Sequence, residues 1–127
     1  MYLKIALSIL SYDVWFYISH LLLHTPTLWF IHKEHHIEEE PMFLDTYKAH
    51  ILEGPFQGGG MFVPYVFYNY SIYETLLILA FLNTRGMMAH DRRFSFLVGN
   101  HHLLHHKYHN CNYGQIYIEY LFGTNKV

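Results

Sequence analysis

The sequence predicts an all-α protein: an integral membrane helical bundle formed by a single domain over residues 1–127. Three observations predict this class. Hydrophobic residues make up 52% of the chain and charged residues only 14%, whereas an ordinary soluble domain carries about 25% charged residues. Two apolar stretches approach the roughly 20 residues that a membrane-spanning helix needs. No segment alternates convincingly enough to predict a sheet.

The first apolar stretch covers residues 5–31 and contains one charged residue, Asp13, and the second covers about 61–82, with Glu74 alone. The run FVPYVFYNYSIY has a strand-like composition, but its continuation into LLILAFL favours a membrane helix. Core helices of a soluble bundle are the alternative, which the low charge content disfavours because few charges remain to cover the outside. The expected helices are 3–24, 28–38, 65–83, 85–92 and 99–108.

Histidines lie on both sides of residues 56–89. If these histidines build one site, the chain between them must enter the membrane and return to the same side. Two full crossings need roughly 40 residues plus a turn, which is more than this segment offers. We therefore expect a shallow or re-entrant hairpin.

Charge and cysteine content exclude two classes of protein. The net charge is −2 with neutral histidines and the pI is about 6.6, so the basic stripe of a nucleic-acid-binding protein is absent. Cys111 is the single cysteine, which excludes an internal disulfide framework and fits a reducing, cytosol-facing environment.

Twelve histidines form the most unusual feature of the chain. His20 and His24, spaced i and i+4, share one helix face. Asp13 and Tyr17 lie on the same side, where a carboxylate could hold the second ring nitrogen of a metal-bound histidine. For this pair alone, two interfacial histidines without a metal would be the simpler interpretation.

The spacing H-x-x-H-H occurs twice, at His32, His35 and His36 and again at His102, His105 and His106. His90 stands between these boxes and is followed by Asp91. Neutral imidazole is the commonest protein ligand of metals near neutral pH, and about nine converging imidazoles exceed what one ion can hold. Two metal ions are therefore predicted. His101 and His109 are interpreted as additional solvated or supporting histidines, and His50, three residues before Glu53, as structural or supporting.

Other catalytic motifs are absent. No histidine follows a glutamate by three residues, as in carboxylate-bridged di-iron bundles, and the zinc motif His-Glu-x-x-His does not occur. No serine lies in a nucleophile elbow, and the glycines at 58–60 lack the lysine of a phosphate loop.

The order H-x-x-x-H, H-x-x-H-H and a distant H-x-x-H-H resembles the three histidine boxes of the fatty acid hydroxylase and sterol desaturase superfamily. YDVWFYISHLLLH looks like the helix that leads into the first box, and HKEHHI looks like the second box. AHILEG occupies the place of a His-Pro-x-Glu-like segment, and AHD resembles the lone histidine before the third box. GNHHLLHHKYHNCNYGQ followed by LFGT is similar to the ending of sterol C-5 desaturases. The resemblance runs from about residue 12 to residue 124.

The resemblance implies a di-iron oxidoreductase in the membrane of the endoplasmic reticulum or an equivalent, with its metal site at the cytosolic face. Such enzymes use O2 and two electrons, from NAD(P)H through an external reductase and cytochrome b5, to hydroxylate or desaturate a sterol or fatty acyl lipid in lipid biosynthesis. The implied ligands are His20, His24, His32, His35, His36, His90, His102, His105 and His106. The residues expected to support them are Asp13, Tyr17, His50, Glu53, Asp91 and Asn112.

The chain departs from this pattern in two places. Family members usually carry two more membrane helices before the first box, which this chain is expected to lack, and Ile118 and Glu119 replace a Trp-Asp pair. A truncated, non-catalytic relative that binds metal, with zinc as the alternative ion, is therefore the second hypothesis. A soluble metal-binding helical domain is the third. A homodimer that replaces the missing helices is a further expectation.

Overall fold

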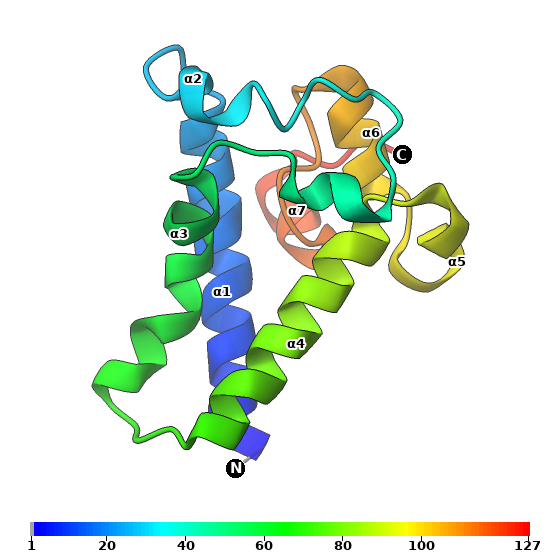
Figure 1. Cartoon of the computed structure of the whole chain (residues 1–127). Coiled ribbons are helices and arrows are strands. Elements are labelled where there is room, and N and C mark those ends of the chain that lie inside the picture. Colours follow the sequence, from blue (N-terminus) through cyan, green and yellow to red (C-terminus); the bar gives the residue numbers. More distant parts are fainter. Residues whose placement is uncertain (1) are drawn as a thin grey trace.

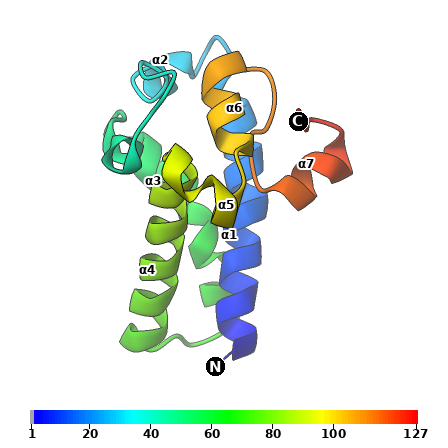
Figure 2. The same cartoon turned by 90° about the vertical axis from the view of Figure 1, so that its right-hand side faces the viewer.

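The structure, a computed structural model, describes residues 2–127 and is helical throughout (Figures 1 and 2). No strand occurs among these residues, so the all-α prediction is confirmed. The elements are α1 (Tyr2–Leu23), α2 (Trp29–His32), η1 (Phe43–Tyr47), α3 (Glu53–Gly58), η2 (Gly59–Val66), α4 (Ile72–Ala89), η3 (Arg92–Phe94), α5 (Ser95–Val98), α6 (His101–Tyr108) and α7 (Ile116–Phe122).

Helix α1 runs from the N-terminus, at the bottom of Figure 1, up to α2 at the top. Its 22 residues correspond to a length of about 33 Å, and the mean hydropathy of its most apolar window is 1.4. By length and composition it can cross a membrane, and it is the one helix within residues 2–127 that meets this criterion.

The two sides of α1 are arranged in the opposite way to a soluble amphipathic helix. Its buried residues include the polar Ser8, Asp13, Ser19 and His20. Its exposed apolar residues are Leu3, Leu10, Val14, Ile18 and Leu22. A helix with lipid on its outside and a polar site within the bundle has this distribution, because intramembrane polar groups face the bundle interior.

A helical hairpin packs against α1. Helices α3 and η2 descend beside α1, and α4 returns toward the end where α1 meets α2 (Figure 1). Residues 56–89 therefore run out and back as a hairpin, and whether this hairpin enters a membrane stays a prediction. The second apolar stretch is divided between η2 and α4, and α4 includes Glu74 and Arg85. It does not form a second helix of the length and hydropathy of α1.

Polar contacts close the hairpin at the end far from the histidines. Ser71 and Glu74 form a capping box that starts α4, which satisfies backbone N–H groups at the helix N-terminus. Lys4 pairs with Glu74 at 2.8 Å, and the Tyr70 hydroxyl donates to the Lys4 carbonyl at 2.8 Å. Above these contacts, a small core is formed by Met61, Ile78 and Leu82.

The structure changes several predicted helix boundaries. The helix predicted at 28–38 ends at His32 and continues as turns through residue 36, which lets neighbouring histidines point to different places. The helices predicted at 65–83 and 85–92 are the single helix α4, whose start the Ser71 capping box sets. Helix α7 was not predicted, since its seven residues, IYIEYLF, are too few for a helical period to emerge.

Gly60 provides a test of the α1–η2 contact. A Cβ at this position would overlap Cβ and Cγ of Trp15, whereas a Cβ on neighbouring Gly59 meets nothing within 4 Å. We expect Gly60→Ala to lower the free energy of unfolding by about 1–3 kcal/mol, the usual range for overpacking, and Gly59→Ala to leave it nearly unchanged. Thermal unfolding of both variants in the same detergent measures this difference. Equal stability of the two variants would contradict the packing described.

Candidate metal centre

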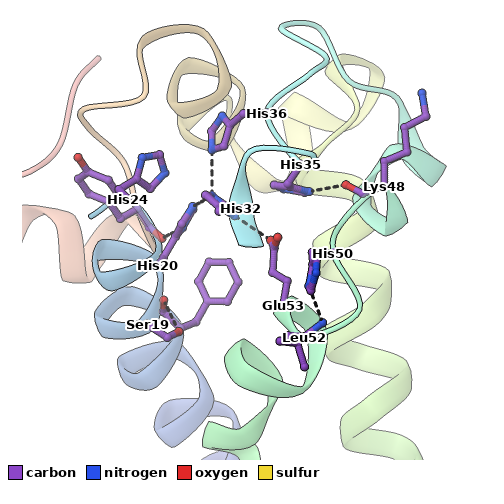
Figure 3. Close-up of polar contacts among 12 residues, drawn as sticks. Ser19, His20, His24, His32, His35, His36, Lys48, His50, Leu52 and Glu53 are labelled. Atoms are coloured by element: carbon purple, nitrogen blue, oxygen red, sulfur yellow. Dashed lines mark hydrogen bonds and ion pairs between the residues drawn. The ribbon is translucent and has the colours of Figure 1, made fainter. Parts of the chain in front are cut away.

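Nine buried or half-buried histidines lie in two adjacent groups, and within each group the potential ligand atoms lie within 4.8 Å of one another. The His20 group consists of His20, His24, His32, His36 and His105. The His90 group consists of His35, His90, His102 and His106. These are the nine residues that the sequence proposed as ligands, and Figure 3 shows several of them turned toward one another between α1, α2 and α3. That they bind metal stays a prediction.

Each H-x-x-H-H box contributes to both groups. Successive residues of an α-helix differ by about 100° in direction, so His105 of α6 points away from His106 and joins the other group. In the second box, the end of α2 at His32 places His35 and His36 in turns, and these neighbours also separate. Each H-x-x-H-H box therefore lies between the two groups.

Backbone carbonyls hold the Nδ1 atoms of five ligand candidates. The contacts are His20 to Tyr113 O at 2.5 Å, His105 to Cys111 O at 2.6 Å, His90 to Gly86 O at 2.7 Å, His106 to Glu38 O at 3.2 Å and His35 to Lys48 O at 3.3 Å. A carbonyl oxygen can only accept, so each of these Nδ1 atoms donates its proton. A neutral ring with the proton on Nδ1 carries its lone pair on Nε2.

Two of these rings face each other through their Nε2 atoms at short distance. His35 and His90 approach at 2.9 Å, although the Nδ1 contacts leave a lone pair on both Nε2 atoms. Two lone pairs cannot share a hydrogen bond, so a cation between them is the arrangement that satisfies both. Nitrogens bound to one ion at about 2.1 Å, at right angles, lie about 3 Å apart. In the same group, His106 Nε2 is buried without any hydrogen-bond partner, so the donor set fits a metal ion.

The electrostatic environment keeps these rings neutral. Burial lowers the pKa of His35 to about 3, with a further contribution from His90. Burial and the neighbouring His24 lower the pKa of His105 to about 3. Protonated imidazolium cannot bind a metal, so these shifts keep the lone pairs available at neutral pH.

Glu53 is the one carboxylate in contact with a ligand candidate. Its Oε1 lies 2.9 Å from His32 Nδ1, and Figure 3 shows the side chain reaching from α3 to that ring. Burial raises the pKa of the Glu53 carboxyl to about 8, and positive charge bound beyond His32 would oppose this shift. A carboxylate that orients a histidine in this way is a common support of metal sites.

Asp13 and Tyr17 do not contact the histidines. Both oxygens of Asp13 pair with Arg85, and one also accepts from the Tyr117 hydroxyl at 2.8 Å. The expectation that Asp13 holds an imidazole is therefore wrong, because a guanidinium from α4 is a stronger partner for a carboxylate than a neutral ring. The Tyr17 hydroxyl contacts Thr124 at 3.1 Å. Both residues instead join α1 to other parts of the fold.

His50 and Asp91 also act outside the two groups. His50 Nδ1 accepts from the Leu52 backbone N–H at 3.2 Å, and Asp91 receives hydrogen bonds from Arg93 and from the Phe43 N–H. Neither makes a hydrogen bond to a histidine. His50 instead contacts the turn before α3, and Asp91, next to His90, joins that part of the chain to Phe43 and Arg93.

Asn112 supports the site indirectly. It is buried and adopts a positive φ of 56°, and its side chain exchanges hydrogen bonds with the Lys126 backbone at 2.7 and 2.9 Å. The carbonyls on either side of it, of Cys111 and Tyr113, accept from His105 and His20. The five carbonyl partners were missed from the sequence, where no signal could reveal them, because every residue has a carbonyl.

A cavity of about 300 Å3 lies beside the His90 group. Its lining includes His35, His90 and His102 of this group, together with His101, which belongs to neither group. Its apolar lining comprises Tyr12, Phe16, Met61, Leu79 and Leu82. Small-molecule sites are typically mostly apolar cavities of about 300–1,000 Å3 with a few placed polar groups, which this one resembles.

Comparison with known proteins shows the family of this chain. The family model described as fatty acid hydroxylase matches residues 5–124, which confirms the family resemblance. A Delta(7)-sterol 5(6)-desaturase of Leptosphaeria maculans is 28% identical over 120 residues, covering 90% of this chain and 34% of that protein. The chain thus spans about a third of the length of this curated relative. No solved structure matches.

The two groups predict that neighbouring histidines serve different ions. His36→Ala and His105→Ala are expected to remove the ion of the His20 group, and His35→Ala the ion of the His90 group, with loss of turnover in all three. His101→Ala changes a buried residue of α6 outside both groups, so it serves as the control and should retain both ions. His109→Ala should lower metal content and turnover much less than His105→Ala. Elemental analysis of the purified variants measures the metal content. Full metal and full activity in His36→Ala would contradict the assignment.

The contact between Glu53 and His32 predicts that loss of the Glu53 charge weakens metal binding without abolishing it. Glu53→Gln retains the shape of the side chain and removes its charge, so metal affinity should fall about 10–100-fold, as for other groups that orient metal-bound histidines. Competition with a chelator measures this affinity. An unchanged affinity would show that the Glu53–His32 contact has no role in metal binding.

Proposed function

Because the chain belongs to the fatty acid hydroxylase family, we propose that it is a membrane-bound oxidoreductase that holds two iron ions and uses O2 and two electrons to hydroxylate or desaturate a lipid. The observation that carries this proposal is the pair of histidine groups, with their Nε2 atoms converging beside a largely apolar cavity. A role in lipid biosynthesis follows from this reaction class.

The chemistry explains the choice of iron. An unactivated C–H bond offers no acidic proton and no leaving group to a side chain, so bound iron would supply the oxidising power. Imidazole ligands suit both iron and zinc, but zinc has no redox chemistry. The donor set is compatible with either ion, and the reaction selects iron.

The residues of the chain have separate tasks in this proposal. The nine histidines hold the ions, and the carbonyls of the 111–113 turn fix the ring orientation of His20 and His105. The cavity lining includes His35, His90 and His102 but no histidine of the His20 group. The oxidised carbon would therefore bind next to the His90 group. The apolar walls, with Met61 and Leu82 among them, would hold the hydrocarbon and exclude water, which protects the reacting centre from side reactions.

The arrangement also supports a membrane orientation. Helix α1 and the hairpin extend to one side of α2 and α6, the helices that carry His32, His102, His105 and His106 (Figure 1), so lipid would surround that part. Of the Lys and Arg residues, Lys4 lies in the first turn of α1, whereas Lys33, Lys48, Arg92, Arg93 and Lys107 lie on segments around the histidine-bearing end. An excess of Lys and Arg marks the cytosolic side of membrane proteins. We therefore assign the site to the cytosolic face of the endoplasmic reticulum or an equivalent membrane, where a reductase and cytochrome b5 would deliver the electrons.

The test is a metal count followed by turnover. Protein purified in detergent under low oxygen should contain two irons per chain, and should oxidise a sterol or fatty acyl lipid when O2, NAD(P)H, a reductase and cytochrome b5 are supplied. Product formation and O2 consumption should occur together, and omission of O2 serves as the control. Zinc in place of iron, or iron-loaded protein without lipid oxidation, would overturn the proposal in favour of a non-catalytic metal-binding relative.

A further inference from the structure

Two buried polar atoms on α3 have no hydrogen-bond partner. They are Glu53 Oε2 and Gln57 Nε2, and their side chains belong to residues that are only 3% and 9% exposed. Positions 53 and 57 are spaced i and i+4, so both side chains lie on the same face of the helix. Both residues line the cavity beside the His90 group.

Such atoms require an explanation. A buried polar group without a partner typically costs about 1–3 kcal/mol, and native proteins contain few of them. Gln57 Nε2 can only donate, and Oε2 of Glu53 accepts in the ionised carboxylate, the form that positive charge bound beyond His32 would favour. A hydroxyl group can accept the first hydrogen bond and donate the second, so one alcohol group could satisfy both residues.

The contacts of Glu53 link this pair to the metal centre. The other oxygen of Glu53 already contacts His32 Nδ1 at 2.9 Å, so the orientation of this carboxyl is constrained by a ligand candidate. His35 and His90 line the same cavity. A hydroxyl bound at Gln57 and Glu53 would therefore lie near the metal centre, while the apolar part of the molecule contacts the apolar walls.

We propose that Glu53 and Gln57 form a hydroxyl-binding subsite, so that these two residues select, among the lipids that the proposed function allows, those with a free hydroxyl group close to the oxidised carbon. This inference rests on the proposed function and narrows its substrate class. The inner carbons of a fatty acyl chain carry no hydroxyl and would leave both polar atoms unpaired. A site built to hydrogen-bond a hydroxyl discriminates strongly against an analogue that lacks it, for the same reason.

Asn83 provides a matched control for Gln57. It is another amide side chain in the cavity lining, but its partners are already present: Nδ2 donates to the Leu79 carbonyl at 2.8 Å, and Oδ1 accepts from the Tyr47 hydroxyl at 3.2 Å. Removal of this amide should not change the preference for a hydroxyl. Gln57→Leu removes the donor, and Gln57→Glu replaces it with an acceptor of similar size.

The experiment compares binding of a sterol with a free 3-hydroxyl and of its 3-deoxy analogue. Metal-loaded protein in lipid nanodiscs is titrated with each, and displacement of a fluorescent sterol gives the affinities without any need for turnover. The wild type should bind the alcohol at least about tenfold more tightly, the equivalent of one hydrogen bond. Gln57→Leu and Gln57→Glu should abolish this preference without weakening binding of the deoxy analogue, and Asn83→Leu should retain it. Unchanged metal content shows that each variant is folded.

The outcomes separate the subsite from the proposed function. Equal affinity of the wild type for both sterols, or an unchanged preference in both Gln57 variants, would overturn the subsite and indicate that water occupies it. Oxidation of fatty acyl lipids without binding of the sterol alcohol would overturn the subsite and leave the proposed function intact. Hydroxyl-dependent binding without oxidation of any lipid would support the subsite and overturn the proposed function.

Discussion

The structure depends on keeping nine imidazoles neutral and aimed at two points. Burial removes the water that would stabilise a protonated ring, and close neighbours repel a second positive charge, so the pKa values of rings such as His35 and His105 fall far below neutrality. Backbone carbonyls then fix which nitrogen carries the proton. The lone pairs on the Nε2 atoms meet at 2.9 Å in the pair His35 and His90, an arrangement that a cation between them would satisfy.

This constraint explains the arrangement of polar and apolar residues in the bundle. Of the helices that carry ligand candidates, α2 and α6 are short. Contacts outside the two histidine groups join the surrounding segments, including the Arg85–Asp13 pair and the bonds between Asn112 and Lys126. The polar residues of α1 face inward, toward these contacts and the histidines, and its apolar residues face outward. A protein with this distribution keeps its polar site within the bundle and presents apolar side chains outward, which suits a lipid environment.

The cavity connects the metal centre to the apolar hairpin. Helix α3 contributes to both, because Glu53 contacts His32 and also lines the cavity with Gln57. One short helix therefore couples the orientation of a ligand candidate to recognition of whatever occupies the cavity. Such coupling would favour oxidation at one position of a bound lipid, because the Glu53 carboxyl would bind the substrate and also orient the His32 ring.

The sequence by itself determined the helical class, the apolar first helix and the nine histidines that come together. These features depend on residue type and local spacing, which the chain displays directly. Only the tertiary structure decided that His35 and His36 belong to different groups, that Asp13 pairs with Arg85, and that the Cys111 and Tyr113 carbonyls orient His105 and His20. The physical reason is that these contacts join residues far apart in the chain or use backbone atoms that all residues share. The local sequence pattern therefore cannot predict them.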